Sequence, residues 1–434
     1  MLRSSSQIFL CACWLFCAVS PGYARQYEYD SGCDCYVPNH TSPDIESNDE
    51  PRSPVSNPFV LKGTGTDAST SQRDISDTVE VVHRQPDGRF ETRRFRYSTP
   101  RIFKNRTNQS VNLWLVFHGG GGNALTMHRF FNQIPHTTPT LIVYPEALQV
   151  NEDNLLDLSG NSGTKWRMAR LPGSASDPNA YRDIAFIEWM GSKLLKHNPQ
   201  LNAARVYATG FSSGAGMTWM LLCYRSALFQ GFAMYSQQLG SERRSGGCGN
   251  GQLPHANDSL TGYEKLTGSL PDQYGHSVSG APNTSAQNAA TVAVFYAHGT
   301  ADKNLVRTGD SGCWEREECD ISEDPLFSMD PGGAFESRDD ISTINWLIAR
   351  HQLSSNPNTS LFLLDSNLSD EKKIIQRNYY AEQEGRITRY QGTPISWLER
   401  IGAEHNVPSV ERGGDYDQSI YTQRFFEIHA DTFQ

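Results

Sequence analysis

Long apolar runs and an excess of positive charge are both missing from this sequence of 434 residues. It holds 38 Lys and Arg against 48 Asp and Glu, which gives a formal net charge of −10. That acidic balance argues against nucleic acid or an anionic membrane surface as the main partner. Beyond residue 24, no segment approaches the roughly 18 consecutive apolar residues that span a bilayer. The sequence therefore predicts neither a nucleic-acid partner nor a membrane anchor.

The first 24 residues have the layout of a secretory signal peptide. A basic start at Arg3 precedes a short apolar run over 8–19, and Gly22 and Ala24 put small residues at −3 and −1 of a cleavage site. We therefore expect residues 1–24 to be removed and the protein to be secreted and extracellular. Seven N-x-[ST] sequons fit a glycosylated surface; they begin at Asn39, Asn105, Asn108, Asn257, Asn283, Asn358 and Asn367.

Cysteine is scarce outside the signal peptide, where the sequence holds Cys33, Cys35, Cys223, Cys248, Cys313 and Cys319. An even number of cysteines in an oxidising compartment indicates disulfides, and three bridges among six cysteines allow about 15 connectivities. We expect Cys223 to pair with Cys248. The two close pairs lack the second CxxC or HxxxH half of a zinc site, so they predict disulfides and no metal.

The chain divides into an arm and one large domain. Residues 25–78 are rich in Ser, Pro, Asp and Asn and predict an irregular N-terminal arm. From 79 to 434, apolar strand patterns alternate with helical ones, which predicts an α/β domain with a mostly parallel sheet covered on both faces. We expect strands at 79–82, 90–97, 113–117, 141–144, 205–209, 231–235, 292–297 and 396–401, and helices around 184–195, 217–228, 341–350 and 419–433.

Two long segments, 238–289 and 309–340, do not fit this alternation and are interpreted as insertions. The second is acidic, which raises the possibility of a calcium loop. It lacks the alternating oxygen ligands of such a loop, so a solvated surface segment is the favoured interpretation.

A strong chemical signal is Gly210-Phe211-Ser212-Ser213-Gly214, which lies between an expected strand and an expected helix. A serine nucleophile needs a sharp strand-to-helix turn, and small residues two positions before and after it let strand and helix approach closely. We therefore expect Ser212 to be a nucleophile. An ordinary turn with incidental serines is the alternative.

A glycine-rich loop, 118–123, follows the strand expected at 113–117. Consecutive glycines free backbone N–H groups to face a ligand, and in esterases such a loop forms half of an oxyanion hole. Gly120 or Gly121 would act there together with the N–H of Ser213. A phosphate-binding loop is the rival, but it requires a Lys-Ser/Thr that does not follow here.

Asp302 and His405 each follow an expected strand. Asp302 would orient an imidazole and His405 would act as general base, whereas a turn-forming aspartate and a surface histidine are the plainer interpretations. His298 is expected to be structural. The order Ser, Asp, His, each at a strand end, is that of α/β-hydrolases, so we expect the α/β-hydrolase fold.

With these motifs the sequence resembles the secreted esterase family that joins polyhydroxybutyrate depolymerases with feruloyl and acetylxylan esterases. The resemblance rests on 118–123, 183–187, 205–214 and 298–302, and covers roughly 79 to 433. It implies a triad of Ser212, Asp302 and His405. One departure is Asn406-Val407-Pro408-Ser409, because the family usually follows its histidine with tryptophan and proline-glycine.

The sequence thus predicts a serine esterase that works through an acyl-enzyme without metal or cofactor. Secretion, sequons and resemblance favour feruloyl or acetyl esters on plant cell-wall polysaccharide. A polyester depolymerase and a non-catalytic wall-binding protein on a hydrolase scaffold stay open as alternatives.

Overall fold

The fold was analysed in a computed structural model. It describes residues 27–30, 35–38, 57–64, 73–84, 90–101, 103, 110–135, 138–149, 164–166, 182–225, 228–237, 292–299, 302, 343–344, 347–348, 353, 358–363, 373–379, 382–383, 386–387, 395–400, 403, 405 and 417–430. The expected signal peptide and both expected insertions lie outside these residues, as does most of the helix expected at 341–350.

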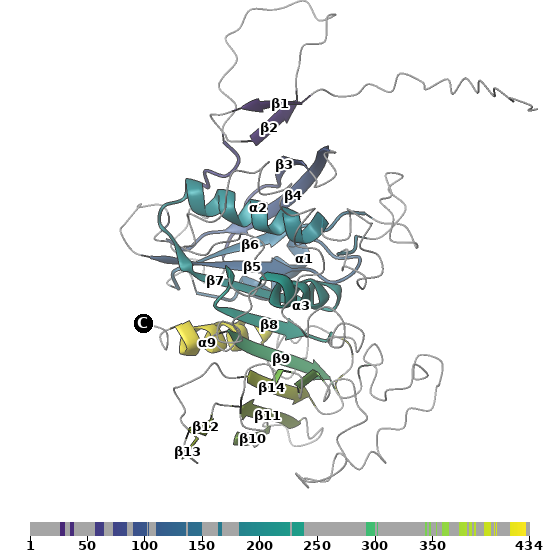
Figure 1. The fold of residues 1–434 in the computed structure, drawn as a ribbon, viewed down its shortest axis with the longest axis vertical. Helices are drawn as coiled ribbons and strands as arrows, with labels where there is room; N and C mark the ends of the chain where they lie inside the picture. The colour runs from purple at the N-terminus through teal and green to yellow at the C-terminus, as the bar shows by residue number, and fades with distance from the viewer. Residues whose placement is uncertain are drawn as a thin grey trace, which may run out of the picture.

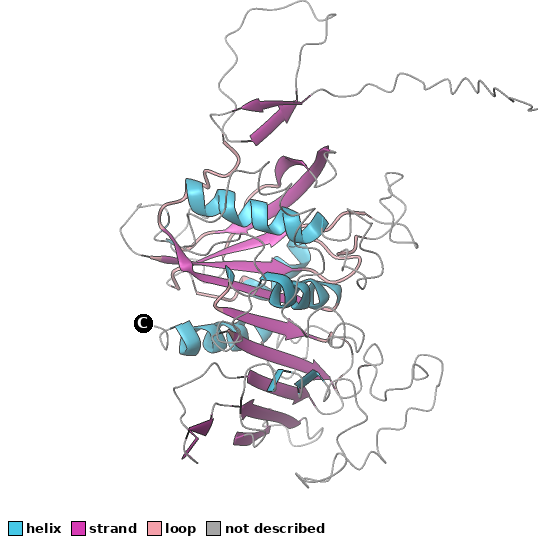
Figure 2. Ribbon diagram, in the orientation of Figure 1, coloured by secondary structure: helices cyan, strands magenta, loops and turns pink. Residues whose placement is uncertain are grey.

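One large sheet dominates the described part of the chain (Figures 1 and 2). Its order is β1-β2-β3-β4-β6-β5-β7-β8-β9-β14-β11-β10. The strands are β1 (Tyr27–Asp30), β2 (Cys35–Pro38), β3 (Val79–Arg84), β4 (Phe90–Ser98), β5 (Val111–Phe117), β6 (Thr140–Pro145), β7 (Leu201–Phe211), β8 (Gly231–Tyr235), β9 (Ala293–Gly299), β10 (Asn358–Leu363), β11 (Lys373–Tyr379) and β14 (Ile395–Arg400). A separate pair joins β12 (Glu382–Gln383) to β13 (Arg386–Ile387).

The strands from β6 to β14 run parallel, whereas β4 pairs antiparallel with β6. From β3 the spatial order is β3, β4, β6, β5, β7, β8, β9 and β14, so that β5 and β6 exchange places and β4 runs against its neighbours; β11 and β10 then complete the edge. This is the α/β-hydrolase fold, as the sequence predicted.

Helices cover both faces of the sheet because its central strands are apolar on both sides. In β5, Leu113, Leu115 and Phe117 join a core that includes α2 (Arg182–His197) and α3 (Ser213–Arg225). Trp114 and Val116 point to the opposite core, which holds α1 (Ala124–Phe131) and α9 (Gln418–Ala430). Figure 1 shows the two pairs of helices on opposite sides of the sheet. None of the helices in the described residues is both long and apolar enough to cross a membrane.

Some element boundaries differ from the expected ones. Helix α3 begins at Ser213 rather than at 217, because Gly214 and Gly216 hide the helical pattern of its first turn. Helix α1 was not expected. It begins after Asn123, whose side chain accepts a hydrogen bond from the N–H of Thr126 and so caps the helix. Strands β10 and β11 were not expected either.

The N-terminal arm is more ordered than predicted. Strands β1 and β2 form a hairpin that joins the sheet through Tyr36 and Val82. Further along, Phe59 is fully buried, stacks on Phe95 and meets Trp189 edge-on. The arm over 25–78, predicted to be mostly irregular, thus also contains a hairpin and an aromatic anchor, even though its composition is polar.

Arg73 anchors the end of the arm in a pocket of backbone carbonyls. Its guanidinium donates to the carbonyl oxygens of Ile134, Pro135, Thr138 and Thr140 over 2.6–2.9 Å. Burial lowers the pKa of Arg73 to about 10. The planar, forked shape of the group lets one side chain reach several oxygens at once.

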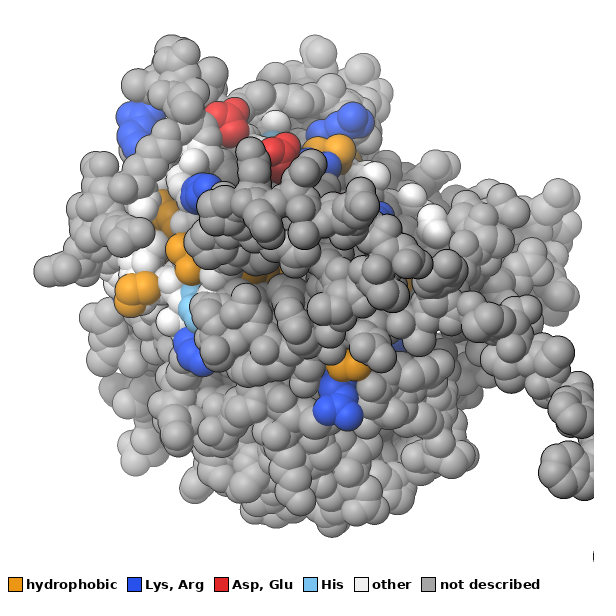
Figure 3. Space-filling view, turned by 90° about the horizontal axis from the view of Figure 1, so that it is seen from above, with side chains coloured by type: hydrophobic (Ala, Val, Ile, Leu, Met, Phe, Trp, Pro, Cys, Tyr) orange, Lys and Arg blue, Asp and Glu red, His pale blue; other side chains and the backbone are white. Residues whose placement is uncertain are grey.

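Charged groups near the first strands are of both signs. Arg94 on β4 pairs with Glu80 on β3 over 2.7 Å, and both side chains are more than half exposed. Figure 3 shows basic, acidic and hydrophobic side chains interspersed over the described part of the face seen from above. Exposed pairs of this kind contribute little to stability.

We expect Arg73→Met to lower the free energy of unfolding by about 3 kcal/mol or more, because it leaves buried carbonyls without donors. Arg73→Lys should recover only part of this, since one ammonium cannot reach four carbonyls. Urea unfolding monitored by tryptophan fluorescence measures both. Arg94→Met is the control and should cost about 0–1 kcal/mol. Equal losses for Arg73→Met and Arg94→Met would contradict the prediction.

Candidate active site

Ser212 stands on a sharp turn between the end of β7 and the start of α3. Its φ is +52°, a left-handed conformation that is uncommon for a residue with a side chain. The turn is held because the Ser212 N–H donates to the carbonyl oxygen of Tyr235 (2.9 Å) and its carbonyl accepts from the Gly216 N–H (3.0 Å). The serine is therefore displayed at the carboxyl end of the parallel strands, where α/β folds place ligand sites.

The glycines on both sides of Ser212 are required by close packing of backbone. A Cβ at Gly210 would lie 2.3 Å from the carbonyl oxygen of Gly214, and one at Gly214 would lie 2.2 Å from the carbonyl oxygen of Phe117. Neither contact is compatible with a side chain. This explains physically why a G-x-S-x-G pattern surrounds the serine.

Ser212, His405 and Asp302 are linked by hydrogen bonds. The His405 Nδ1 atom lies 2.9 and 2.8 Å from the two carboxylate oxygens of Asp302, and Nε2 lies 2.9 Å from the Ser212 hydroxyl oxygen. Since a carboxylate only accepts, Nδ1 donates, and Nε2 is left to accept from the hydroxyl. Asp302 is buried, and its backbone N–H bonds to Gly299 at the end of β9. The structure thus brings together the three side chains that the sequence analysis selected.

Gly120, Gly121 and Ser213 are the candidates that the sequence offers for oxyanion donors. Gly121 does not suit this role, because its N–H donates to the carbonyl oxygen of Thr164 (2.8 Å). A Cβ added at Gly120 would lie 3.9 Å from the Ser213 Cβ, so this glycine and the first residue of α3 face each other. Of the two glycines considered, Gly120 therefore fits, and Ser213 also benefits from the positive end of the helix dipole.

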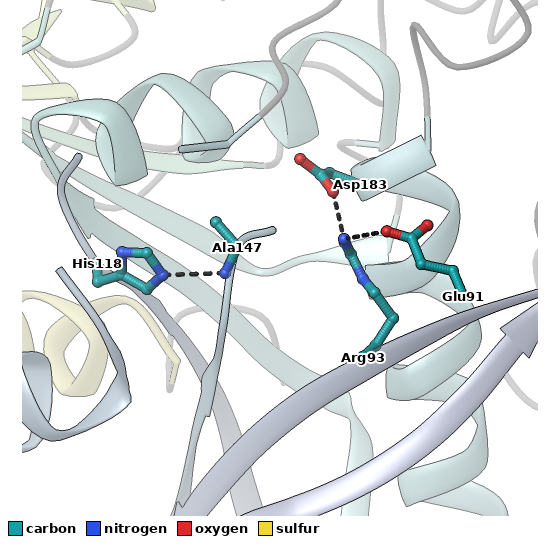
Figure 4. Close-up of polar contacts among 5 residues, drawn as sticks. All are labelled: Glu91, Arg93, His118, Ala147 and Asp183. Atoms are coloured by element: carbon teal, nitrogen blue, oxygen red, sulfur yellow. Dashed lines mark hydrogen bonds and ion pairs between the residues drawn. The ribbon is translucent and has the colours of Figure 1, made fainter. Parts of the chain in front are cut away.

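His118 fixes the path of the glycine loop. Its Nδ1 donates to the carbonyl oxygen of Gly119 (2.8 Å), and its Nε2 accepts from the N–H of Ala147 (3.0 Å, Figure 4). The Gly122 N–H bonds to the same Gly119 carbonyl (3.0 Å). Because the carbonyl of a trans peptide points opposite to the following N–H, these bonds direct the Gly120 N–H away from His118.

The segment 164–166 clamps the loop from outside. Thr164 donates its hydroxyl to the Gly122 carbonyl (2.6 Å), and the indole N–H of Trp166 donates to the His118 carbonyl (2.8 Å). Sequence reasoning missed this clamp, because 164–166 carries no periodic pattern and its bonds span 42 and 48 residues.

A buried ion pair supports the neighbouring helix. Arg93 on β4 bonds to Asp183 in the first turn of α2 over 2.5 Å and to Glu91 over 3.3 Å, as Figure 4 shows. The guanidinium of Arg93 also lies 4.3 Å from the ring centre of Phe186. Burial raises the pKa of Glu91 despite the nearby arginine. Asp183 therefore tethers α2 to the sheet.

The other predicted site residues lie elsewhere or outside the described part of the chain. His298 is buried on β9 and stacks on Trp397. Cys223 on α3 is disulfide-bonded, while its expected partner Cys248 lies outside the described residues. Of the seven sequon asparagines, the backbone of Asn358 alone is described, as the first residue of β10. Among the described residues, no three His, Cys, Asp or Glu gather closely enough to hold a metal ion.

No protein-family model matches the chain, and no curated protein matches it in sequence. Among solved structures it is similar to an S-formylglutathione hydrolase from Agrobacterium tumefaciens, with 11% identity over 86% of this chain and 100% of the other, and a TM-score of 0.41. It is also similar to an acetyl xylan esterase from Aspergillus awamori, with 11% identity over 81% of this chain and 99% of the other, and a TM-score of 0.39. A putative dipeptidyl aminopeptidase IV from Bacteroides ovatus shares 13% identity over 83% of this chain and 36% of its own, with a TM-score of 0.40. These similarities are too distant to bear on the chemistry.

The burial of His118 predicts that the free energy of unfolding depends on pH. Desolvation lowers the pKa of His118 from 6.5 to about 4, so the folded chain keeps it neutral while the unfolded chain takes up a proton near pH 6.5. This contribution to stability is present above pH 6.5 and is lost as the pH falls toward 4. At its full extent the loss is about 3 kcal/mol.

His118→Asn isolates that contribution. The variant should be less stable than the parent at pH 7, because it loses the bonds to Gly119 and Ala147, but its stability should fall less between pH 7 and pH 4. Urea unfolding curves at several pH values in that window give the comparison. Parallel pH dependences in the two proteins would contradict a neutral, buried His118.

Proposed function

We propose that this protein is a serine hydrolase that cleaves carboxylic esters through an acyl-enzyme. The observation that carries the proposal is the continuous hydrogen-bonded chain from Ser212 through His405 to Asp302, with heavy-atom distances of 2.8–2.9 Å. A nucleophile, a base and a group that orients the base are then in reach of one another.

In the first half-reaction, His405 Nε2 takes the proton of Ser212 as its oxygen attacks the ester carbonyl. Asp302 holds the imidazole in the tautomer that leaves Nε2 free to accept and stabilises the imidazolium that forms. The imidazolium then protonates the departing alcohol, which leaves the acyl group on Ser212. In the second half-reaction, His405 activates a water that releases the acid and restores the serine.

The negative charge of each tetrahedral intermediate needs preorganised donors. We assign this role to the N–H groups of Gly120 and Ser213, because the two residues lie close together beside Ser212 and the start of α3 adds its dipole. His118 and Thr164 hold the loop in place before substrate binds, so no reorganisation is needed during the reaction. Removing one donor of this kind costs about 10²–10³ in rate in other enzymes.

Ser212→Ala should lower the turnover of p-nitrophenyl acetate by about 10⁴-fold or more, and Asp302→Asn by a comparable factor. The reason is that each breaks the proton-transfer chain while leaving the fold intact. Circular dichroism and the melting temperature check the fold. Ser98→Ala, a buried serine on β4, is the control and should keep full activity. Full activity of Ser212→Ala would refute the assignment.

For the substrate, we infer feruloyl or acetyl esters on plant cell-wall polysaccharide, acted on outside the cell. The expected signal peptide, the sequons and the family resemblance support this inference. A polyester depolymerase would need a broad apolar surface near Ser212. In the described part of the chain, the exposed large hydrophobics Val60, Phe90, Leu125 and Ile428 are scattered, and only Leu125 closely follows the glycine loop.

Two substrates separate these possibilities. We expect the protein to release ferulate from wheat arabinoxylan, measured by chromatography. We expect it not to degrade a polyhydroxybutyrate film, which should stay turbid. Ser212→Ala supplies the blank for both assays. Clearing of the film without ferulate release would favour the polyester alternative.

A non-catalytic wall-binding protein is the candidate from a different class, and the residues after His405 are its only support. The intact hydrogen-bonded chain speaks against it. Labelling with a fluorophosphonate discriminates, because only an activated serine reacts. Wild type should be labelled and Ser212→Ala should not.

A further inference from the structure

Phe211, the last residue of β7, lies next to the imidazole of His405. The two ring centroids are 5.0 Å apart and the ring planes are inclined by 41°. Phe211 is partly buried and packs against the core that contains α1 and α9. Its side chain therefore joins the rigid sheet to the base, although it takes no part in the hydrogen-bonded chain.

The hydrogen bonds of His405 do not by themselves fix the tilt of its ring. Nδ1 is held by Asp302 and Nε2 by Ser212, so the bonds define an axis that runs through the two nitrogens. Rotation about that axis tilts the ring plane and changes the directions of the N–H and of the lone pair. A second ring packed against the imidazole opposes this tilt.

The glycine loop provides the space for the phenylalanine. A Cβ at Gly119 would lie 3.2 Å from Phe211 Cδ1, 3.5 Å from the Phe211 carbonyl oxygen and 3.5 Å from the Ser212 Cβ. A methyl group at this position would force the Phe211 ring to shift by a few tenths of an ångström, while it would meet Ser212 at an ordinary contact distance. Gly119 thus lets the oxyanion loop, the nucleophile and the base share one packed contact.

We propose that Phe211 is a positioning residue for His405 and that Gly119, by lacking a side chain, leaves the space that the Phe211 ring occupies. The ring holds the imidazole in the plane that serves both Asp302 and Ser212. The inference deepens the esterase proposal and rests on it.

The first test is Phe211→Leu, which keeps an apolar side chain but removes the ring. With p-nitrophenyl acetate we expect kcat to fall about tenfold while KM stays within about twofold, because a misaligned base affects the transition state more than substrate binding. Phe211→Tyr keeps the ring and should restore kcat to within about threefold of wild type. A purely structural role would lower the melting temperature in Phe211→Leu without this split between kcat and KM.

Phe229→Leu is the matched control. Phe229 meets Phe232 at the same centroid separation, 5.0 Å, and at a similar angle, 47°, but it lies just before the amino end of β8, away from Ser212. This variant should lose stability and keep kcat. A tenfold loss of kcat in Phe229→Leu would show that any lost aromatic pair has the same effect, which would overturn the proposal.

A double-mutant cycle tests the link to Gly119. Gly119→Ala alone should lower kcat, because its Cβ displaces Phe211. In the Phe211→Leu background the same change should cost markedly less, since the ring that it displaces is absent. If the two substitutions lower kcat independently, so that their effects on the activation free energy add, Gly119 does not act by leaving space for Phe211.

Ser212→Ala in the same assays distinguishes a failure of the esterase proposal from a failure of the role proposed for Phe211. If Ser212→Ala stays active, the esterase proposal fails. If Ser212→Ala is inactive while Phe211→Leu keeps wild-type kcat, only the role of Phe211 fails. Slower but complete fluorophosphonate labelling of Phe211→Leu is the expected confirmation that its serine is present and its base is misaligned.

Discussion

The close approach of backbone to backbone at Gly214 is the constraint on which the site depends. Its Cα is so near the carbonyls of Phe117 and His118 that a single methyl group would lie 2.2 and 2.6 Å from their oxygens. This contact presses the first turn of α3 against the end of β5. It therefore sets the distance between the nucleophile, which precedes that turn, and the glycine loop, which follows that strand. The left-handed conformation of Ser212 is a consequence of the same tight turn and is tolerated because its N–H and carbonyl are both bonded.

The polar groups around the site fall into two sets with different tasks. Ser212, His405 and Asp302 form a chain in which protons can move. His118 and the segment 164–166 form a scaffold whose hydrogen bonds are all satisfied while the histidine is neutral. Burial suits the scaffold because a low pKa keeps His118 neutral at pH 7, so that its hydrogen bonds do not change. The Phe211 ring adds an apolar contact to His405 beside the glycine loop.

Local signals predicted much of this arrangement. The continuous apolar runs gave β5 and β6, and the parallel sheet follows from their alternation with helices. Asp302 and His405 could be selected because each follows a buried strand, and parallel strands place their carboxyl ends together. Other features depend on contacts between distant residues. Nothing local marks Thr164 or Arg73 as a partner of carbonyls far along the chain, and the glycines that permit the tight turn concealed the start of α3.

The parallel pairing of β9 and β14 separates the geometry of the triad from the length of chain inside it. Asp302 and His405 are 103 residues apart in sequence. Yet Gly299 and Arg400 are direct neighbours in the ladder, and each triad residue follows only a few positions later. The chain between them begins and ends at positions that the sheet fixes. The entropic cost of closing such a loop rises only slowly with its length. A change in the length of chain between Asp302 and β10 therefore need not move Asp302 relative to His405, and the proton relay keeps its geometry.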